Sequence, residues 1–201
     1  MFDSLPDLPL ERRWHSQIFP GPVVVAIIQR ETAVVHDPHS TIPQYLLIRR
    51  NGDTYKGKWA LVGGKWDFGE TLVTAVVREV KEETGLDADF LALRGLVSER
   101  LAPPDPKGPA AHFLILVCEL LAEEGDAREQ GEGAVAWFSR SEIDALNEQN
   151  RIIPSDYMMI QHFAGAGHMV PHVEAEMVTH LGDRQEHPTH LVRFERMDGL
   201  V

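Results

Sequence analysis

Three glutamates lie at helical spacing near the middle of this 201-residue chain: Glu79, Glu82 and Glu83. At about 100° of rotation per residue, their side chains fall within an arc of roughly 100° on one helix face. Carboxylate oxygens grouped in this way suit hard cations such as Mg²⁺ or Mn²⁺. A cation held there would neutralise a polyphosphate and activate a water molecule. The cluster therefore predicts metal-dependent chemistry on a phosphate compound, and the alternative is a solvated acidic helix face.

The residues around the glutamates predict the helix that must position them. Thr71 is a suitable N-cap, and Gly85 suits the left-handed position after the last turn. Like charges at this spacing destabilise a bare helix, and a bound cation would reverse that cost. The carboxylates are expected at the edge of the core, because an adjoining arc of the helix is apolar: Leu72, Val73, Val76, Val77 and Val80.

The stretch from Gly64 to Leu86 resembles the Nudix box, whose pattern is G-x5-E-x7-R-E-U-x-E-E-x-G-U with U a bulky aliphatic residue. The flanks agree, since Tyr45–Arg50 looks like the strand before the box and Trp59–Gly64 resembles the family's W-x-x-P-G-G segment. Val62 stands where many members have proline, which removes no ligand. Every fixed position of the pattern is filled, by Gly64, Glu70, Arg78, Glu79, Val80, Glu82, Glu83, Gly85 and Leu86.

This resemblance implies a fold and a reaction type. The fold would be an α/β/α sandwich around a mixed β-sheet, with residues 1–163 as the Nudix hydrolase domain and 164–201 as a C-terminal extension. The reaction would be attack of water on a pyrophosphate phosphorus in a nucleoside diphosphate linked to another moiety. ADP-ribose, a nucleotide sugar and a nucleoside triphosphate all remain open as substrates, with Mg²⁺ or Mn²⁺ as the cofactor.

The resemblance also implies roles for residues of the box. The three helix glutamates would be metal ligands, with the carbonyl of Gly64 as an additional one. Arg78 would orient the glutamates through a charge-assisted fork, the alternative being a weak surface ion pair. Glu70 would stabilise the loop–helix unit or reach the metals through water. Alternatively, it is a first-turn glutamate favoured by the helix dipole.

Two loops carry further expectations. The family often places its general base on a loop outside the box, and residues 123–133 form such a loop here. Glu132 is the preferred candidate and Glu129 the second, although either one could be a plain solvated glutamate. Pro103, in the proline-rich segment 102–109, resembles in position a marker of ADP-ribose-cleaving members.

Charge limits the partners of the chain. The formal net charge is −12, which disfavours nucleic acid polymers and anionic membranes. A polyphosphate would be repelled as well, which makes the cation necessary for a small-molecule nucleotide substrate. One basic set before the predicted helix either contacts substrate phosphates or is solvated: Arg49, Arg50, Lys56, Lys58 and Lys65.

A cytoplasmic location is the default expectation. No apolar run approaches the roughly 18 residues of a membrane span. Residues 1–13 are interrupted by acidic side chains and do not read as a secretory signal. Cys118 is the single cysteine, so an intramolecular disulfide is excluded and a buried small apolar role is expected.

Hydrophobic patterns and turn residues predict the remaining elements. Helices are expected from Ser139 or Ser141 to about Leu146 and from Pro154 to Phe163. Strands are expected over residues 23–29, 44–50, 59–62, 91–98, 112–121 and 134–138.

The tail predicts a β-hairpin from residues 172–178 and 189–197, joined through Gly182 and Asp183. We expect it to extend the sheet or to form a homodimer contact, serving assembly or substrate closure rather than chemistry. A zinc site is the weaker alternative, because no cysteine accompanies the histidines that enrich this region: His162, His168, His172, His180, His187 and His190.

Two other functions compete with hydrolysis. A nucleotide-binding sensor without turnover would be favoured by degenerate box carboxylates, and none is degenerate. An isomerase of the isopentenyl-diphosphate type would need a cysteine and an altered box, and Cys118 lacks the matching context.

Overall fold

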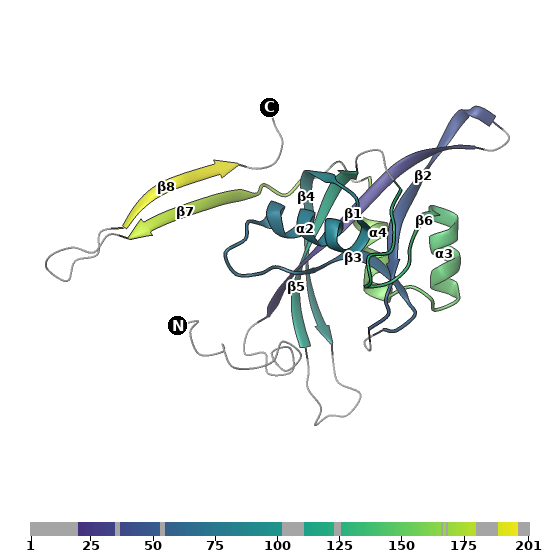
Figure 1. The fold of residues 1–201 in the computed structure, drawn as a ribbon, viewed down its shortest axis with the longest axis horizontal. Coiled ribbons are helices and arrows are strands. Elements are labelled where there is room, and N and C mark those ends of the chain that lie inside the picture. Colours follow the sequence, from purple (N-terminus) through teal and green to yellow (C-terminus); the bar gives the residue numbers. More distant parts are fainter. Residues whose placement is uncertain are drawn as a thin grey trace, which may run out of the picture.

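The computed structural model describes residues 20–34, 37–52, 55–101, 111–122, 126–165, 167, 169–179 and 189–196. The strands in these ranges are β1 (Gly21–Val34), β2 (Asp37–Arg49), β3 (Trp59–Lys65), β4 (Ala88–Leu101), β5 (Ala111–Ala122), β6 (Val135–Ser139), β7 (Val173–Thr179) and β8 (Thr189–Arg196). The helices are α2 (Leu72–Thr84), α3 (Arg140–Glu148) and α4 (Pro154–Phe163) (Figure 1).

Six of the described strands form one mixed sheet in the order β4-β5-β1-β3-β2-β6. Strands β1 and β5 run parallel, from the pair Gly21 and Phe113 to the pair Ile28 and Leu120. The other neighbours are antiparallel. Strand β1 is long enough to pair with β3 near its start and with β2 over its second half. Strand β1 therefore changes partner from β3 to β2 along its length.

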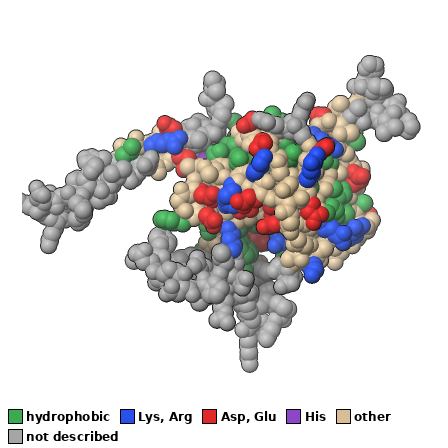
Figure 2. Space-filling view, viewed as in Figure 1, with side chains coloured by type: hydrophobic (Ala, Val, Ile, Leu, Met, Phe, Trp, Pro, Cys, Tyr) green, Lys and Arg blue, Asp and Glu red, His purple; other side chains and the backbone are tan. Residues whose placement is uncertain are grey.

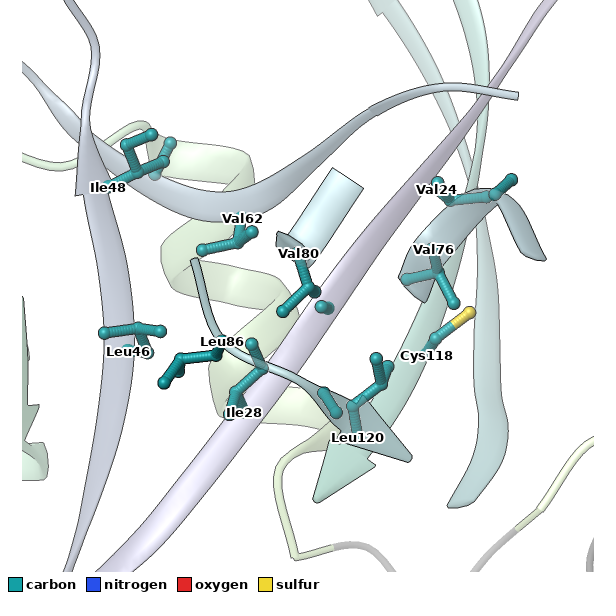
Figure 3. Packing of buried hydrophobic residues seen from close by; sticks show 14 of the residues in the cluster. Val24, Ile28, Leu46, Ile48, Val62, Val76, Val80, Leu86, Cys118 and Leu120 are labelled. Carbon is teal, nitrogen blue, oxygen red and sulfur yellow. The ribbon is translucent and has the colours of Figure 1, made fainter. Parts of the chain in front are cut away.

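The sheet is covered on both faces, as Figure 1 shows for α2 and α4. On one face the buried stripe of α2, which includes Leu72, Val76 and Val80, packs on strand residues such as Val24 and Leu120 (Figure 3). A second core on the other face joins α3 and α4 to the sheet. These two layers confirm the predicted α/β/α sandwich.

Several local predictions are confirmed. Helix α4 has the predicted limits, and α3 starts after Ser139, whose side chain forms a capping box with Glu142. Cys118 is buried, and burial raises the pKa of its thiol to about 12. Strand β1 runs beyond the predicted 23–29, because Gln29 to Val34 pair with β2.

The tail forms the predicted hairpin, but the hairpin does not extend the main sheet. Among the described strands, β7 and β8 pair only with each other, and they project away from the body of the molecule (Figure 1). The expectation of a sheet extension was therefore wrong. The predicted proline-rich segment with Pro103, and Gly182 and Asp183 of the hairpin turn, lie outside the described residues. No helix in the described ranges is long and apolar enough to cross a membrane.

Candidate active site

A glycine-rich loop leads from β3 into α2, and hydrogen bonds hold both this loop and the ends of the helix. The Thr71 side chain accepts a hydrogen bond from the amide of Thr74 at 3.1 Å, so Thr71 is the N-cap. Trp66 Nε1 donates to the carbonyl of Glu70 at 3.0 Å, which closes the loop on itself. At the other end of the helix, Gly85 has φ 73° and ends the last turn. Both predicted caps are confirmed.

Arg78 is the centre of the polar network on this helix. Its Nε and Nη2 atoms donate to the two oxygens of Glu70 at 2.7 and 3.0 Å, which is a bidentate ion pair. Its Nη1 donates to Glu79 at 2.8 Å and to Glu82 at 3.0 Å, and Nη2 also reaches the carbonyl of Lys65 at 3.1 Å. One guanidinium thus ties the loop to the helix carboxylates. Figure 2 shows acidic and basic side chains gathered on the face that carries α2.

These ion pairs shift the pKa values of both partners in the expected directions. The hydrogen bond from Arg78 is the main reason that the pKa of Glu70 is lowered. The same bond is the main reason that the pKa of Arg78 is raised. At neutral pH Glu70 is therefore a carboxylate and Arg78 a cation, which keeps the fork intact.

Glu83 is the most enclosed of the three helix glutamates. Its side chain is buried and accepts a hydrogen bond from the amide of Gly63 at 2.9 Å. Burial raises the pKa of Glu83 to about 8, and the charges of Glu132 and Glu79 add to the effect. A side-chain interaction with Glu132 raises the pKa of Glu83 further.

The loop backbone explains how Glu132 comes to lie there. Asn51 Nδ2 donates to the carbonyl of Gly131 at 2.8 Å, and the amide of Arg49 donates to the carbonyl of Ala134 at 2.7 Å. Gly133 has φ 148° and packs so tightly that an added Cβ would lie 1.9 Å from the carbonyl oxygen of Arg49. The end of β2 thus anchors this loop on both sides of Glu132.

Glu79 lies against the backbone of Gly64. A Cβ added at Gly64 would be 2.5–2.7 Å from the carboxylate atoms of Glu79, so a larger residue here would displace the Glu79 side chain. Burial raises the pKa of Glu79, and the hydrogen bond from Arg78 opposes the shift. Glu82 is more open, with 57% of its side chain exposed, and its described contact is with Arg78.

The donor set suits a hard divalent cation, although it is not already assembled around one point. Among the described residues, no three His, Cys, Asp or Glu side chains are arranged as a ready ligand group. Arg78 holds an oxygen of both Glu79 and Glu82. The charges of Glu132 and Glu79 both act on the buried Glu83 carboxyl and raise its pKa. A bound Mg²⁺ or Mn²⁺ ion prefers such oxygen donors and would offset the repulsion between them.

Other candidate residues lie apart from this cluster. Glu129 and Glu132 are both exposed, but only Glu132 is among the groups that raise the pKa of Glu83. Lys58 donates to Asn150 at 2.7 Å, and Arg49 to the carbonyl of Gly57 at 3.3 Å. Lys65 joins the cluster through its carbonyl.

The histidines of the tail do not form a metal site within the described ranges. His162 is exposed, whereas His172 is buried beside Glu174. His168, His180 and His187, and the side chain of His190, lie outside what the structure describes.

Sequence reasoning missed one residue beside helix α2. Glu174 Oε1 accepts a hydrogen bond from the amide of Leu72, the first residue of α2, at 3.1 Å. The sequence feature that could have indicated such a partner is the lack of an acidic residue in the first turn of α2.

Comparison with known proteins gives the same assignment as the box. A model of the NUDIX domain matches residues 28–160. An ADP-ribose pyrophosphatase of Methanocaldococcus jannaschii is 30% identical over 148 residues, which cover 73% of this chain and 78% of that protein. A putative nudix hydrolase 1 of Caenorhabditis elegans is 45% identical over 111 residues, covering 54% of this chain but 28% of that protein.

Solved structures agree on the fold. A crystal structure of a MutT NUDIX hydrolase from Burkholderia pseudomallei superposes with a TM-score of 0.56 at 24% identity, covering 72% of this chain and 98% of that chain. With a complete box on α2, a matching domain model and a relative of similar extent, the chain belongs to the Nudix family and is a pyrophosphohydrolase of that family.

Proposed function

We propose that the chain hydrolyses, with Mg²⁺ or Mn²⁺, the pyrophosphate bond of a nucleoside diphosphate linked to another moiety. The observation that carries this proposal is the cluster of charged side chains at α2. Arg78 donates hydrogen bonds to Glu70, Glu79 and Glu82. Glu83 is buried beside Glu132. ADP-ribose is the first substrate to try, because a relative whose match covers 73% of this chain is named for that activity. Nucleotide sugars and nucleoside triphosphates are the other members of the panel.

The helix glutamates are proposed as the metal ligands, with the carbonyl of Gly64 as a further one. When bound, the divalent cation would neutralise pyrophosphate charge and activate a water molecule. The chain itself keeps the ligands in place: the amide of Gly63 holds Glu83, and Arg78 holds Glu79 and Glu82 until the cation competes for them. Members of the Nudix family generally use divalent metals, which agrees with this donor set.

Glu132 is the proposed general base. It lies close enough to Glu83 for its charge to raise the pKa of that carboxyl, which places it beside the proposed metal ligands. Its loop is anchored to the end of β2 on both sides, which keeps this exposed residue beside the cluster. Glu129 remains the second candidate on the same loop.

A screen of the three substrate classes tests the proposal. Each compound is incubated with the chain and Mg²⁺ or Mn²⁺, and products are separated by chromatography, with EDTA as the control. We expect AMP and ribose 5-phosphate from ADP-ribose, and no product with EDTA. Nucleotide binding without turnover under every condition would instead favour the sensor alternative.

The division of the chain and its assembly are also proposals. Residues 1–163 would be the hydrolase domain, and 164–201 an extension whose hairpin forms a homodimer contact in the cytoplasm. The support is that Leu191, Val192 and Phe194 of β8 are 56%, 61% and 67% exposed, and that a lone two-stranded hairpin is only marginally stable. Light scattering should give a dimer mass for the parent and a monomer mass for Leu191→Ser with Phe194→Ser. A monomeric parent would contradict this contact.

A further inference from the structure

Residues 169–174, which we name the strap, connect the edge of the sheet to the start of the catalytic helix. The amide of Val170 donates to the carbonyl of Leu93 in β4 at 2.8 Å. The ring of His172 is buried and meets Phe90 of β4 edge-on, with 6.1 Å between ring centroids. Glu174 then reaches the amide of Leu72 at 3.1 Å. The strap lies beyond residues 28–160, which match the family model.

Glu174 meets a specific need of α2. The first four amides of a helix have no partner within the helix. Thr71 satisfies the amide of Thr74, and Glu174 satisfies that of Leu72. Because the first turn of α2 contains no acidic residue, Glu174 also supplies the negative charge that the positive end of the helix dipole attracts.

His172 orients the Glu174 carboxylate. The distance from His172 Nε2 to Glu174 Oε1 is 2.9 Å, and since a carboxylate can only accept, Nε2 is the donor. His172 Nδ1 is buried and is the one such side-chain atom without a hydrogen-bond partner among the described residues.

We infer that Glu174, held by His172, is a positioning residue for catalysis by the Nudix box. Leu72 follows Glu70 by two residues, and Glu70 forms the bidentate pair with Arg78 that in turn holds Glu79 and Glu82. Fixing the Leu72 amide therefore fixes the point where the box loop enters the helix. The inference rests on the proposed function of the box carboxylates.

The test compares Glu174→Ala and Glu174→Gln with Glu195→Gln, an exposed glutamate of the same hairpin that pairs with Arg193. At 25 °C, with each protein folded, we expect Glu174→Ala to lower kcat about three- to tenfold, the range for losing a partly buried charge at a helix end. KM should change less than twofold. Glu174→Gln should lie between Glu174→Ala and the parent because its amide oxygen still accepts, and Glu195→Gln should match the parent.

Amide hydrogen exchange at Leu72, followed by NMR without metal or substrate, provides a readout independent of turnover. We expect faster exchange in Glu174→Ala and parent-like exchange in Glu195→Gln. If the parent hydrolyses nothing on the panel, the proposed function fails, while the exchange rates still decide whether Glu174 caps α2. A folded Glu174→Ala with parental kcat and metal activation would overturn the positioning role. Should Glu174→Ala not fold, the same result from Glu174→Gln together with His172→Gln would overturn it.

Discussion

Two buried carboxyls reach strand β3 from opposite faces of the sheet. Glu83 on α2 accepts from the amide of Gly63 at 2.9 Å, and Asp156 on α4 accepts from the amide of Leu61 at 2.7 Å. Burial is the main cause of a raised pKa in both, to about 8 for Glu83 and about 7 for Asp156. The backbone bond lowers the pKa in each case, and it is outweighed.

Glu83 and Asp156 differ in the charged groups around them. Glu83 has further carboxyls at Glu132 and Glu79, both of which raise its pKa. Asp156 lies in the layer of α4, where the smaller influences of Glu99 and Arg50 oppose each other. The same backbone contact thus serves a carboxyl whose two acidic neighbours act in the same direction on one face, and a carboxyl whose charged neighbours oppose each other on the other face. Burial and a raised pKa alone do not identify a catalytic group; a second carboxyl in contact is the more telling feature.

The largest effect is expected from removing the carboxylate of Glu132, the neighbour that distinguishes Glu83 from Asp156. Glu132→Gln should lower kcat by roughly 10²- to 10⁴-fold, the range for loss of a general base, while the affinity for Mn²⁺ changes little. Steady-state kinetics on the best substrate of the panel measures this. Glu129→Gln is the matched control and should stay near the parent. If the control shows the large loss instead, the base is Glu129; if neither does, the base is not on this loop.

A smaller effect is expected when the Arg78 guanidinium, which binds Glu70 and the helix carboxylates, is removed. Arg78→Lys keeps the charge but cannot make the bidentate pair with Glu70 or hold Glu79 and Glu82 at the same time. Loss of one charge-assisted hydrogen bond corresponds to about tenfold or more in kcat. Arg151→Lys, an exposed arginine outside the site, is the control. Parental kinetics in Arg78→Lys would mean that the fork does not position the ligands.

On the opposite face the expected effect concerns stability instead of turnover. The pKa of Asp156 is about 7 in the folded protein against 3.8 for an ordinary aspartate, so folding favours its protonated form. Its contribution to stability is therefore fully present below about pH 4, and it is lost as the pH rises to about 7. The slope between these values can reach about 1.4 kcal/mol per pH unit.

Asp156→Asn should abolish that slope, because the asparagine oxygen still accepts from Leu61 but does not titrate. Urea unfolding of the parent and the variant between pH 4.5 and 8 measures the difference, and Glu83 contributes equally to both. Asp89→Asn, at an exposed position, is the control. An identical pH dependence of parent and Asp156→Asn would show that Asp156 is not shifted by burial.

Sequence predicts best what depends on neighbouring residues. The limits of α2 and α4 follow from local signals, namely the Thr71 cap, the Gly85 stop and Pro154 in the first turn. The second half of β1 is polar, from Gln29 to Thr32, and is a strand only because β2 lies beside it. No local pattern can show such a pairing.

The same limit applies to the candidate site. The box fixes the spacing of Glu79, Glu82 and Glu83. Which of these carboxylates Arg78 contacts is determined only by the folded structure. Glu132 is placed by the anchoring of its loop to β2. The contact of Glu174 with α2 joins residues 102 positions apart in the chain, beyond the reach of any periodicity.

Glu83→Gln tests the central claim most directly, that the helix carboxylates hold a divalent cation for hydrolysis. The variant keeps the size of the buried side chain and the acceptor for the Gly63 amide, but it removes one ligand charge. With Mn²⁺ and the best substrate of the panel, kcat should fall by a factor on the order of 10² or more, and Mn²⁺ binding measured by electron paramagnetic resonance should weaken. Glu148→Gln, exposed on α3, should behave as the parent. A folded Glu83→Gln protein with near-normal turnover and Mn²⁺ affinity would contradict the account.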